Sequence, residues 1–263
     1  MCAQKKVEHP KVSVVTVCFN AEDSIKSTIN SVISQDYRDV EYIIVDGGSF
    51  DKTVDIIKEN ENKISFLVSE KDSGIFDAMN KSLSFCNGEW IIFMNAGDEF
   101  YNSHIISEVA PYLNSKEDFV YGDSEILYGD YRLIRKAKSA DYLWKGMIFS
   151  HQSLFSRLSI LKEKKFRLDT ISADFYLVLS CFYDGFKFKQ LDFPISSVSP
   201  NGFSDKNQLR VIFAWRDEVR KIHPGLKTEI YYAERIFITK MSQLIKKIIP
   251  GPAVDFIRKI KNG

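Results

Sequence analysis

The chain has 263 residues, of which 44% are hydrophobic and 27% charged, as in ordinary globular domains with a sizeable core. A net charge of +1 excludes nucleic-acid binding driven by bulk electrostatics. Four cysteines without a CxxC pair indicate a reduced cytoplasmic protein rather than a zinc site or a disulfide framework. We expect neither a signal peptide nor a transmembrane helix, because no apolar run is long enough.

The first hundred residues alternate between β-branched apolar runs and segments whose apolar residues have helical spacing. Strands are expected at 11–19, 40–48, 63–70 and 89–95. Helices are expected between them, at 24–35, 51–60 and 73–86. This βαβαβαβ order predicts a parallel sheet with helices on both faces.

The second half is less regular. A hairpin is expected from strands at 118–127 and 131–138, and an extended segment at 186–199 ends before Pro200. Helices are expected at 170–185, 206–222, 228–249 and 252–261.

Polar residues follow the predicted strands of the first half. Asn20 follows the first strand, Asp46 the second and Asp72 the third. Asp98 ends the fourth, in the stretch WIIFMNAGDEF. Because ligands of parallel sheets bind beyond the carboxyl ends of the strands, we expect these residues to converge at one edge.

The run Asn95-Ala96-Gly97-Asp98 has two interpretations. Asn, Gly and Asp are turn formers, so the run can simply reverse the chain. A carboxylate at a strand end can also hold Mg²⁺ or Mn²⁺, which prefer oxygen ligands. In that case Asp98 is the metal ligand and Asn95 lies beside it.

Other candidates also keep two interpretations. Asp46 either caps the next helix or accepts a hydrogen bond from a base or ribose; its context, DGGSFD, is not the GxGxxG of dinucleotide-binding proteins. His151 and Gln152 interrupt an apolar stretch, as a satisfied core pair or as ligands. Asp174 is either a favourable charge near a helix start or a general base.

Several segments, taken in order and spacing, resemble family 2 glycosyltransferases with the GT-A fold, in particular those of bacterial polysaccharide and lipopolysaccharide assembly. The resemblance covers about residues 11–200. The matching segments are VSVVTVCFNAEDSIKSTINSVISQDY, EYIIVDGGSFDKT, SEKDSGIFDAMNKSL, GEWIIFMNAGDEFY, SHQSLFSR and SADFYLVL.

The resemblance implies where the sugar-nucleotide donor binds. The residues implied at the base and ribose are Thr16, Asn20, Glu22, Asp46 and Gly47. Those implied along the sugar-nucleotide site are Asp72, Gly74, Asp77 and Asn80. NAGD stands where the family's DxD motif stands, which implies that Asn95, Ala96 and Gly97 lie at the donor and that Asp98 binds Mn²⁺ or Mg²⁺.

The resemblance also implies the chemistry. Asp174 matches the acid that deprotonates the acceptor in inverting members, and His151, followed by Gln152, matches a position near the metal and the acceptor. Residues 199–205 resemble a loop that closes over the donor. The chain departs from the family pattern where Asn95 and Gly97 replace the acids of a plain DxD.

The expected fold is therefore α/β of the GT-A type, with a mostly parallel central sheet and a C-terminal helical extension. Its expected divisions are a tail at 1–10, a catalytic domain at 11–204 with donor and acceptor halves meeting at residue 100, and the extension at 205–263.

The expected function is inverting transfer of a hexosyl or N-acetylhexosaminyl group. The donor is a nucleotide-diphosphate sugar, a UDP-sugar by resemblance, and the acceptor is a hydroxyl of a glycan or lipid-diphosphate-linked oligosaccharide of the cell surface. Two alternatives stay open, a catalytically silent sugar-nucleotide-binding protein and a sugar nucleotidyltransferase. The second would carry a Gly-rich, basic loop after the first strand, which CFNAEDS lacks.

The C-terminal tail is basic. Residues 227–263 hold eight Lys/Arg and three Asp/Glu, a net charge of +5 that leaves −4 for the rest. Apolar residues share one helical face from Ile238 to Ile249, with lysines around it. Such a helix can lie on an anionic membrane, and in one interpretation 238–263 holds the protein on the inner face of the plasma membrane. The alternative is docking onto the catalytic domain or a dimer partner.

Overall fold

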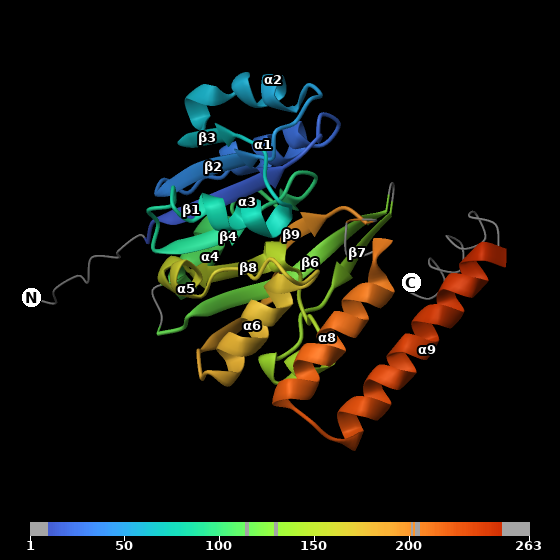
Figure 1. The fold of residues 1–263 in the computed structure, drawn as a ribbon. Coiled ribbons are helices and arrows are strands. Elements are labelled where there is room, and N and C mark those ends of the chain that lie inside the picture. The colour runs from blue at the N-terminus through green and yellow to red at the C-terminus, as the bar shows by residue number, and fades with distance from the viewer. Residues whose placement is uncertain (1–9, 114–115, 129–130, 201, 203–205, 249–263) are drawn as a thin grey trace, which may run out of the picture.

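The fold is a mixed sheet with helices on both faces, seen in a computed structural model that describes residues 10–113, 116–128, 131–200, 202 and 206–248 (Figure 1). Within these ranges the sheet has nine strands in the order β3-β2-β1-β4-β8-β6-β9-β5, with β7 paired to β6. The strands are β1 (Val12–Cys18), β2 (Val40–Asp46), β3 (Phe66–Ser69), β4 (Trp90–Phe93), β5 (Glu99–Phe100), β6 (Phe119–Tyr128), β7 (Tyr131–Arg135), β8 (Leu154–Arg157) and β9 (Phe188–Val198).

Helices connect and cover these strands. The α-helices are α1 (Ile25–Ile33), α2 (Thr53–Lys58), α3 (Ile75–Ser82), α4 (Ile105–Leu113), α5 (Leu158–Lys164), α6 (Ala173–Tyr183), α8 (Gln208–Ile222) and α9 (Leu226–Ile248). Short 3₁₀ turns are η1 (Glu61–Lys63), η2 (Ala140–Lys145) and η3 (His151–Ser153).

The predicted βαβαβαβ unit is confirmed, and it forms the parallel part of the sheet. β1 pairs in parallel with both β2 and β4, and β2 pairs in parallel with β3. The second half departs from the expected parallel arrangement, because β8 runs antiparallel to both β4 and β6. The chain reaches β8 through the hairpin of β6 and β7 and through the 3₁₀ turns η2 and η3, without the α-helical crossover that connects parallel strands.

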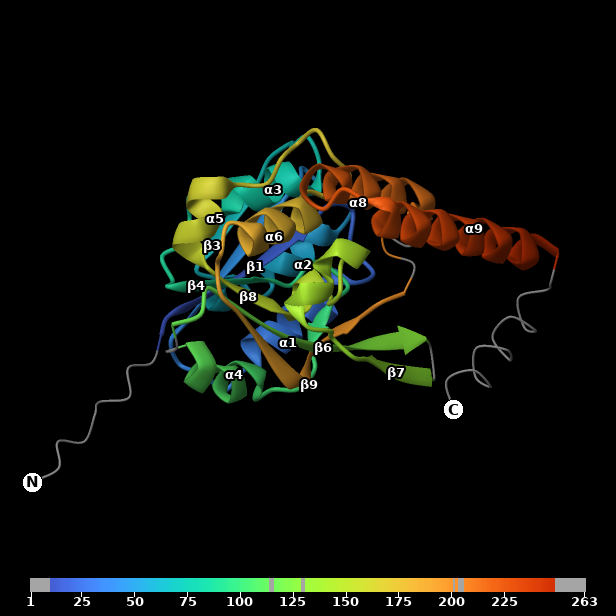
Figure 2. The ribbon, with the colours of Figure 1, turned by 90° about the horizontal axis from the view of Figure 1, so that it is seen from below.

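The alternation of β1 builds a core on each face of the sheet. Val15 and Val17 face the cluster that includes α3 and α6, whereas Val12 and Val14 face the cluster that includes α1 and α4. Figure 2 shows the two groups of helices on opposite sides of the sheet.

The expected hairpin of β6 and β7 and the extended strand β9 are confirmed, although residues 129–130 at the hairpin tip lie outside the described part. The sequence pattern did not indicate β5 or, in the second half, α4, η2, η3, β8 and α5. The helix expected at 252–261 lies outside the described residues.

The two C-terminal helices pack against each other, and α9 also touches η2. In Figures 1 and 2 the distal part of α9 extends beyond the body of the protein. Among the residues described, no helix combines the length and apolarity that a membrane-spanning segment requires.

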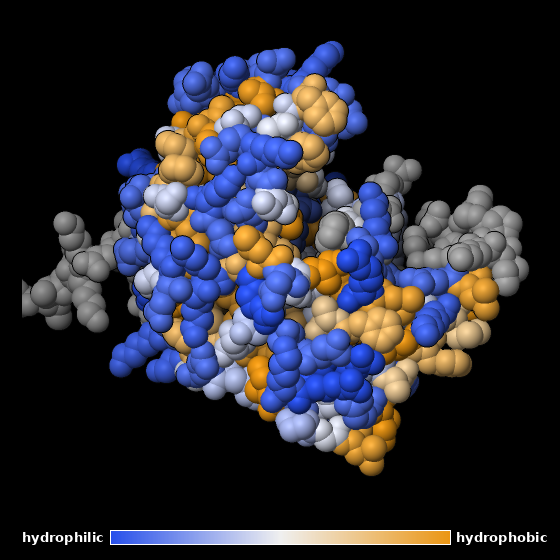
Figure 3. All heavy atoms as spheres, viewed as in Figure 1, coloured by the Kyte–Doolittle hydropathy of each residue, from blue (hydrophilic) through white to orange (hydrophobic). Residues whose placement is uncertain are grey.

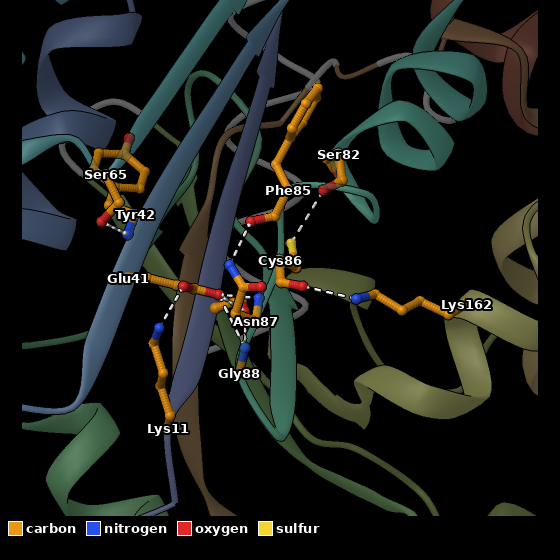
Figure 4. A network of polar contacts seen from close by, with 11 residues as sticks. Lys11, Glu41, Tyr42, Ser65, Ser82, Phe85, Cys86, Asn87, Gly88 and Lys162 are labelled. Carbon is orange, nitrogen blue, oxygen red and sulfur yellow. Dashed lines mark hydrogen bonds and ion pairs between the residues drawn. The ribbon is translucent and has the colours of Figure 1, made fainter.

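The buried carboxylate of Glu41 connects the beginnings of β1 and β2 with the turn before β4 (Figure 4). Glu41, at the start of β2, accepts hydrogen bonds from the Ser13 hydroxyl of β1 at 2.6 Å and from the Gly88 amide before β4 at 2.9 Å. Lys11 forms an ion pair with the same carboxylate at 2.6 Å. A Cβ on Gly88 would lie 2.6 Å from the Ser13 hydroxyl, so only glycine permits this approach. Burial acts to raise the pKa of Glu41, but hydrogen bonds from Lys11 and Ser13 hold it below its ordinary value.

We expect Glu41→Gln to lower the free energy of unfolding by about 2–4 kcal/mol at pH 7, because it removes the charge that Lys11 and the buried donors face. Since the native pKa of Glu41 is depressed, its contribution is present above pH ~4.5 and is lost as the pH falls through the native pKa. Urea unfolding at pH 7 and pH 3.5 checks this prediction.

Glu59→Gln is the matched control, since Glu59 is exposed at the end of α2 and should change stability by less than about 0.5 kcal/mol. A Glu41→Gln effect equal to the control, or one that does not shrink at acidic pH, would contradict the role assigned to the carboxylate.

Candidate active site

A cavity of about 820 Å³ opens beyond the carboxyl end of β4. The start of α6, η3 and the C-terminal helices also line it. Seven residues predicted from the sequence line this one cavity: Asn95, Ala96, Gly97, Asp98, His151, Gln152 and Asp174.

The antiparallel pairing of β8 with β4 explains why these residues meet. Trp90 at the start of β4 pairs with Arg157 at the end of β8. Residues that precede β8 therefore lie beside residues that follow β4. This places His151 and Gln152 next to Asn95 and Asp98.

The segment after β4 is held in shape by Thr28, a buried hydroxyl on α1. Thr28 accepts a hydrogen bond from the Gly97 amide at 2.9 Å and donates to the Asp98 carbonyl at 2.8 Å. Gly97 has φ +96°, a left-handed conformation that favours glycine. The one signal of Thr28 in the sequence is a polar residue between the apolar positions of a predicted helix.

Asp98 presents a half-buried carboxylate to the cavity. Its Oδ2 atom accepts a hydrogen bond from Gln152 Nε2 at 2.6 Å. Burial raises the pKa of Asp98 to about 7, against the smaller opposing effect of the Gln152 hydrogen bond. A carboxyl in this state favours a bound cation, which would stabilise its charged form.

His151 joins Asn95 to Asp174. The Asn95 amide nitrogen lies 2.9 Å from His151 Nε2, and His151 Nδ1 lies 3.6 Å from Asp174 Oδ2. With the amide as donor, Nε2 is the acceptor and Nδ1 carries the proton that faces Asp174. Burial lowers the pKa of His151, against a smaller opposing effect of Asp174, so the imidazole is neutral near pH 7.

The residues after β4 fit a divalent cation with an affinity for oxygen. The Asn95 Oδ1 atom is buried and, among the described residues, has no hydrogen-bond partner. The Asp98 carboxylate is three residues away and, among the described residues, forms no ion pair with a Lys or Arg. No cluster of three or more His, Cys, Asp or Glu in the described part of the chain could hold a metal by itself. An ion here would therefore take its remaining ligands from a bound substrate.

The predicted base and ribose residues lie outside this cavity, at the ends of β1 and β2. Asp46 is fully buried and accepts hydrogen bonds from the Ser49 amide at 2.9 Å and the Ser69 hydroxyl at 2.6 Å. Thr16 is fully buried and donates to the Met94 carbonyl at 2.7 Å. Both side chains thus shape the loops, and their contact with a nucleotide stays a prediction.

Asn20 and Glu22 cross-link the loops after β1 and β2. The Asn20 side chain accepts from the Phe50 amide at 3.1 Å, and Glu22 accepts from the Lys52 amide at 3.0 Å. Beside them, Phe19 and Phe50 expose 57% and 84% of their surface with ring centroids 6.0 Å apart. The sequence pattern had not indicated these two rings.

The residues predicted before and along α3 contact mainly protein groups. Asp72 accepts from the Gly74 amide at 2.8 Å, and a Cβ on Gly47 would lie 2.5 Å from the Asp72 carboxylate. Asp77 accepts from the Ser73 amide at 2.9 Å. Asn80 bonds both the amide and the carbonyl of Phe166, at 2.8 and 2.7 Å. Their donor-binding roles also stay predictions.

Three basic residues that sequence reasoning had not singled out line the cavity, namely Arg135 on β7, Lys206 before α8 and Arg235 on α9. Of the loop predicted at 199–205, the described residues Ser199, Pro200 and Gly202 line the cavity as well. The remaining residues of that loop lie outside the described part.

The architecture is the GT-A fold of glycosyltransferases. A mannosyltransferase from Pyrobaculum calidifontis, solved with GDP-Man and Mn²⁺, superposes with a TM-score of 0.68 at 16% identity, over 96% of this chain and 79% of that one. S. aureus TarS in complex with UDP-GlcNAc gives a TM-score of 0.63 at 16% identity, over 80% of this chain and 66% of that one.

The sequence identifies the family. The profile of glycosyl transferase family 2 matches residues 13–176, more than half of the chain, and the chain belongs to this family.

Curated relatives match over part of their length. A PGL/p-HBAD biosynthesis glycosyltransferase of Mycobacterium bovis is 28% identical over 151 residues, 56% of each chain. The UDP-Glc:α-D-GlcNAc-diphosphoundecaprenol β-1,3-glucosyltransferase WfgD of Escherichia coli is 28% identical over 117 residues, 44% of this chain and 46% of that one. The chain thus spans about half the length of the curated relatives it matches.

We expect Asp98→Asn to stabilise the metal-free protein more at pH 8 than at pH 5. A native pKa of about 7 means that the folded state retains the proton longer than the unfolded state, so native stability falls as the pH rises from about 4 to about 7. Asparagine has no such dependence, and the stabilisation by Asp98→Asn should differ between the two pH values by about 1–2 kcal/mol after allowance for solvent screening.

Urea unfolding in EDTA measures this difference, with Asp23→Asn, a substitution of an exposed acid, as the control. Equal effects of Asp98→Asn at both pH values would show that Asp98 titrates normally.

Proposed function

We propose that the protein is an inverting glycosyltransferase that moves a sugar from a nucleotide-diphosphate donor to an acceptor hydroxyl. The observation that carries the proposal is that Asp98 and Asp174 line one cavity, with His151 between Asn95 and Asp174. In this proposal one carboxylate serves the donor diphosphate and the other the acceptor, so that both reactants of a single displacement meet in one cavity.

The donor is proposed to lie across the ends of β1, β2 and β4, with its nucleotide at the loops that Asn20 and Glu22 cross-link. The exposed rings of Phe19 and Phe50 offer faces on which a base can stack. A uridine nucleotide is the proposed donor, in line with the UDP-GlcNAc bound by TarS and the UDP-Glc in the name of the E. coli relative.

Asp98, with the Asn95 amide oxygen, is proposed to hold Mn²⁺ or Mg²⁺ against the donor diphosphate. When bound, such an ion neutralises charge that develops on the leaving diphosphate. Gln152 would orient the Asp98 carboxylate through the hydrogen bond to its Oδ2 atom.

Asp174 is proposed to be the general base. Its carboxylate takes the proton of the acceptor hydroxyl as that oxygen attacks C1 of the sugar from the face opposite the diphosphate. The new glycosidic bond forms as the C1–O bond to the diphosphate breaks, and the anomeric configuration inverts. His151 Nδ1 lies 3.6 Å from Asp174 Oδ2, so the imidazole is a neighbour of the proposed base without a direct hydrogen bond to it.

The acceptor is proposed to be a glycan or a lipid-diphosphate-linked oligosaccharide, reached at the cytoplasmic surface of a membrane. The support is the outer part of α9, where Ile238, Leu244 and Ile245 expose 46–57% of their surface and Lys240 is also exposed. Figure 3 shows hydrophobic residues on the surface of this helix. An apolar helix face flanked by lysines is suited to an anionic lipid surface.

We expect Asp174→Asn to lower kcat by at least about a hundredfold while donor affinity stays near that of wild type, because the amide cannot accept the proton. Transfer is measured by release of the nucleoside diphosphate, and donor affinity by thermal shift with UDP- and GDP-sugars in Mn²⁺ or EDTA. Asp184→Asn, at the other end of α6 and paired with Lys164, is the matched control and should keep full turnover. Retained turnover in Asp174→Asn would refute the assignment of the base.

We expect the double variant Leu244→Glu and Ile245→Glu to bind vesicles of phosphatidylcholine and phosphatidylglycerol at least about tenfold more weakly, because two apolar side chains no longer enter the lipid interface. Flotation measures the bound fraction. Leu168→Glu is the control, since Leu168 is 61% exposed but lies far from α9 in sequence, before α6. Unchanged flotation of the double variant would reject the membrane role of α9.

A further inference from the structure

Part of the cavity lining carries positive charge. Arg135, Lys206 and Arg235 come from three different elements and line the same cavity. Among the described lining residues the carboxylates are Asp98 and Asp174, which belong to the chemistry proposed above. The charges in the cavity therefore come from different parts of the chain, with acids supplied by the segments after β4 and before α6, and bases by β7 and the C-terminal helices.

Arg235 is held in a fixed orientation. Its Nη1 atom donates to the Lys145 carbonyl at 2.7 Å and to the Tyr231 hydroxyl at 2.9 Å. Its guanidinium lies 5.1 Å from the centroid of the Trp215 ring. Both hydrogens of Nη1 are thus used, whereas Nε and Nη2 have no hydrogen-bond partner among the described residues. These two atoms form the edge of a guanidinium that binds an oxyanion with paired hydrogen bonds.

Arg135 is anchored to the same loop. Its Nη2 atom lies 3.4 Å from the Met147 carbonyl, two residues after the carbonyl that Arg235 contacts. The two guanidinium groups therefore lie near residues 145–147, on either side of Gly146. Lys206 is exposed at the entrance to α8 and adds a third positive charge to the cavity.

We propose that Arg135, Lys206 and Arg235 form a phosphate-binding subsite for the acceptor. Three positive charges match a phosphate or diphosphate, which carries two or more negative charges, better than a single carboxylate. The donor diphosphate has its own place at Asp98, so this second anion is assigned to the acceptor. The assignment to an acceptor rests on the proposed function, whereas the presence of the anion subsite does not.

The test uses inorganic pyrophosphate and the full-length protein in EDTA, with binding followed by calorimetry and by the fluorescence of Trp215 and the other tryptophans. We expect saturable binding to wild type and at least about tenfold weaker binding to Arg235→Gln, because paired charged hydrogen bonds are lost. Lys206→Gln should also weaken binding, and this exposed side chain has no packing role that would complicate the result. Lys240→Gln, an exposed lysine of α9 that does not line the cavity, should stay within about twofold of wild type.

Affinity for UDP with Mn²⁺ is measured on the same variants to separate the two anion sites. Unchanged UDP affinity in Arg235→Gln and Lys206→Gln supports an acceptor subsite, whereas a parallel loss would assign the cations to the donor and overturn the proposal. Absence of pyrophosphate binding to wild type, or equal binding by all variants, would also overturn it. A wild type that binds pyrophosphate but no sugar nucleotide would refute the proposed function and leave the anion site standing.

A last comparison identifies the source of the phosphate. Wild type and Arg235→Gln are floated with phosphatidylcholine vesicles that contain phosphatidic acid. Flotation that depends on Arg235 supports the subsite with a lipid-borne phosphate, and pyrophosphate binding without such flotation supports it with a water-soluble one.

Discussion

The buried carboxylate of Glu41 is the contact on which the geometry of the site depends. It joins β1, β2 and the turn before β4 at the edge of the sheet away from the cavity. At the opposite edge, β1, β2 and β3 end level with one another, because Cys18 pairs with Asp46 and Asp46 with Ser69. The loops that carry Asn20, Gly47 and Asp72 therefore leave the sheet at one edge. A charge far from the cavity thus determines which side chains can meet there.

The second requirement is a reversal of direction within the sheet. If β8 had continued the parallel pattern, the residues before it would lie at the Glu41 edge. Because it runs antiparallel to β4, its preceding turn delivers His151 and Gln152 to Asn95 and Asp98. The chain joins a first part built by parallel crossovers to a second part in which β8 runs antiparallel to both of its neighbours, and the cavity lies where the two parts meet.

The first hundred residues were predictable because each strand and helix there has its own period and its own turn residues. The convergence of Asn95, Asp98, His151 and Asp174 followed from resemblance and strand-end placement, and all four line the cavity. β8 and α5 escaped prediction because their short apolar runs have no distinctive period, and α4 contains Pro111. Burial of Thr16 and Asp46 could not be foreseen either, since it depends on Met94, Ser49 and Ser69 from other segments. The basic wall was invisible to the sequence pattern because Arg135, Lys206 and Arg235 are far apart along the chain.

Gly146 lies against the ring of Trp215 on α8, so closely that a Cβ at this position would overlap the ring. The C-terminal helices therefore pack on the rest of the chain at this glycine. The family profile ends at residue 176, before α8 and α9 begin. The residues proposed for the chemistry thus lie in the part that matches the family, whereas residues of α8 and α9 complete the lining of the same cavity. Such an arrangement would allow evolution to exchange the helices and so change the acceptor, while the proposed catalytic centre is inherited intact.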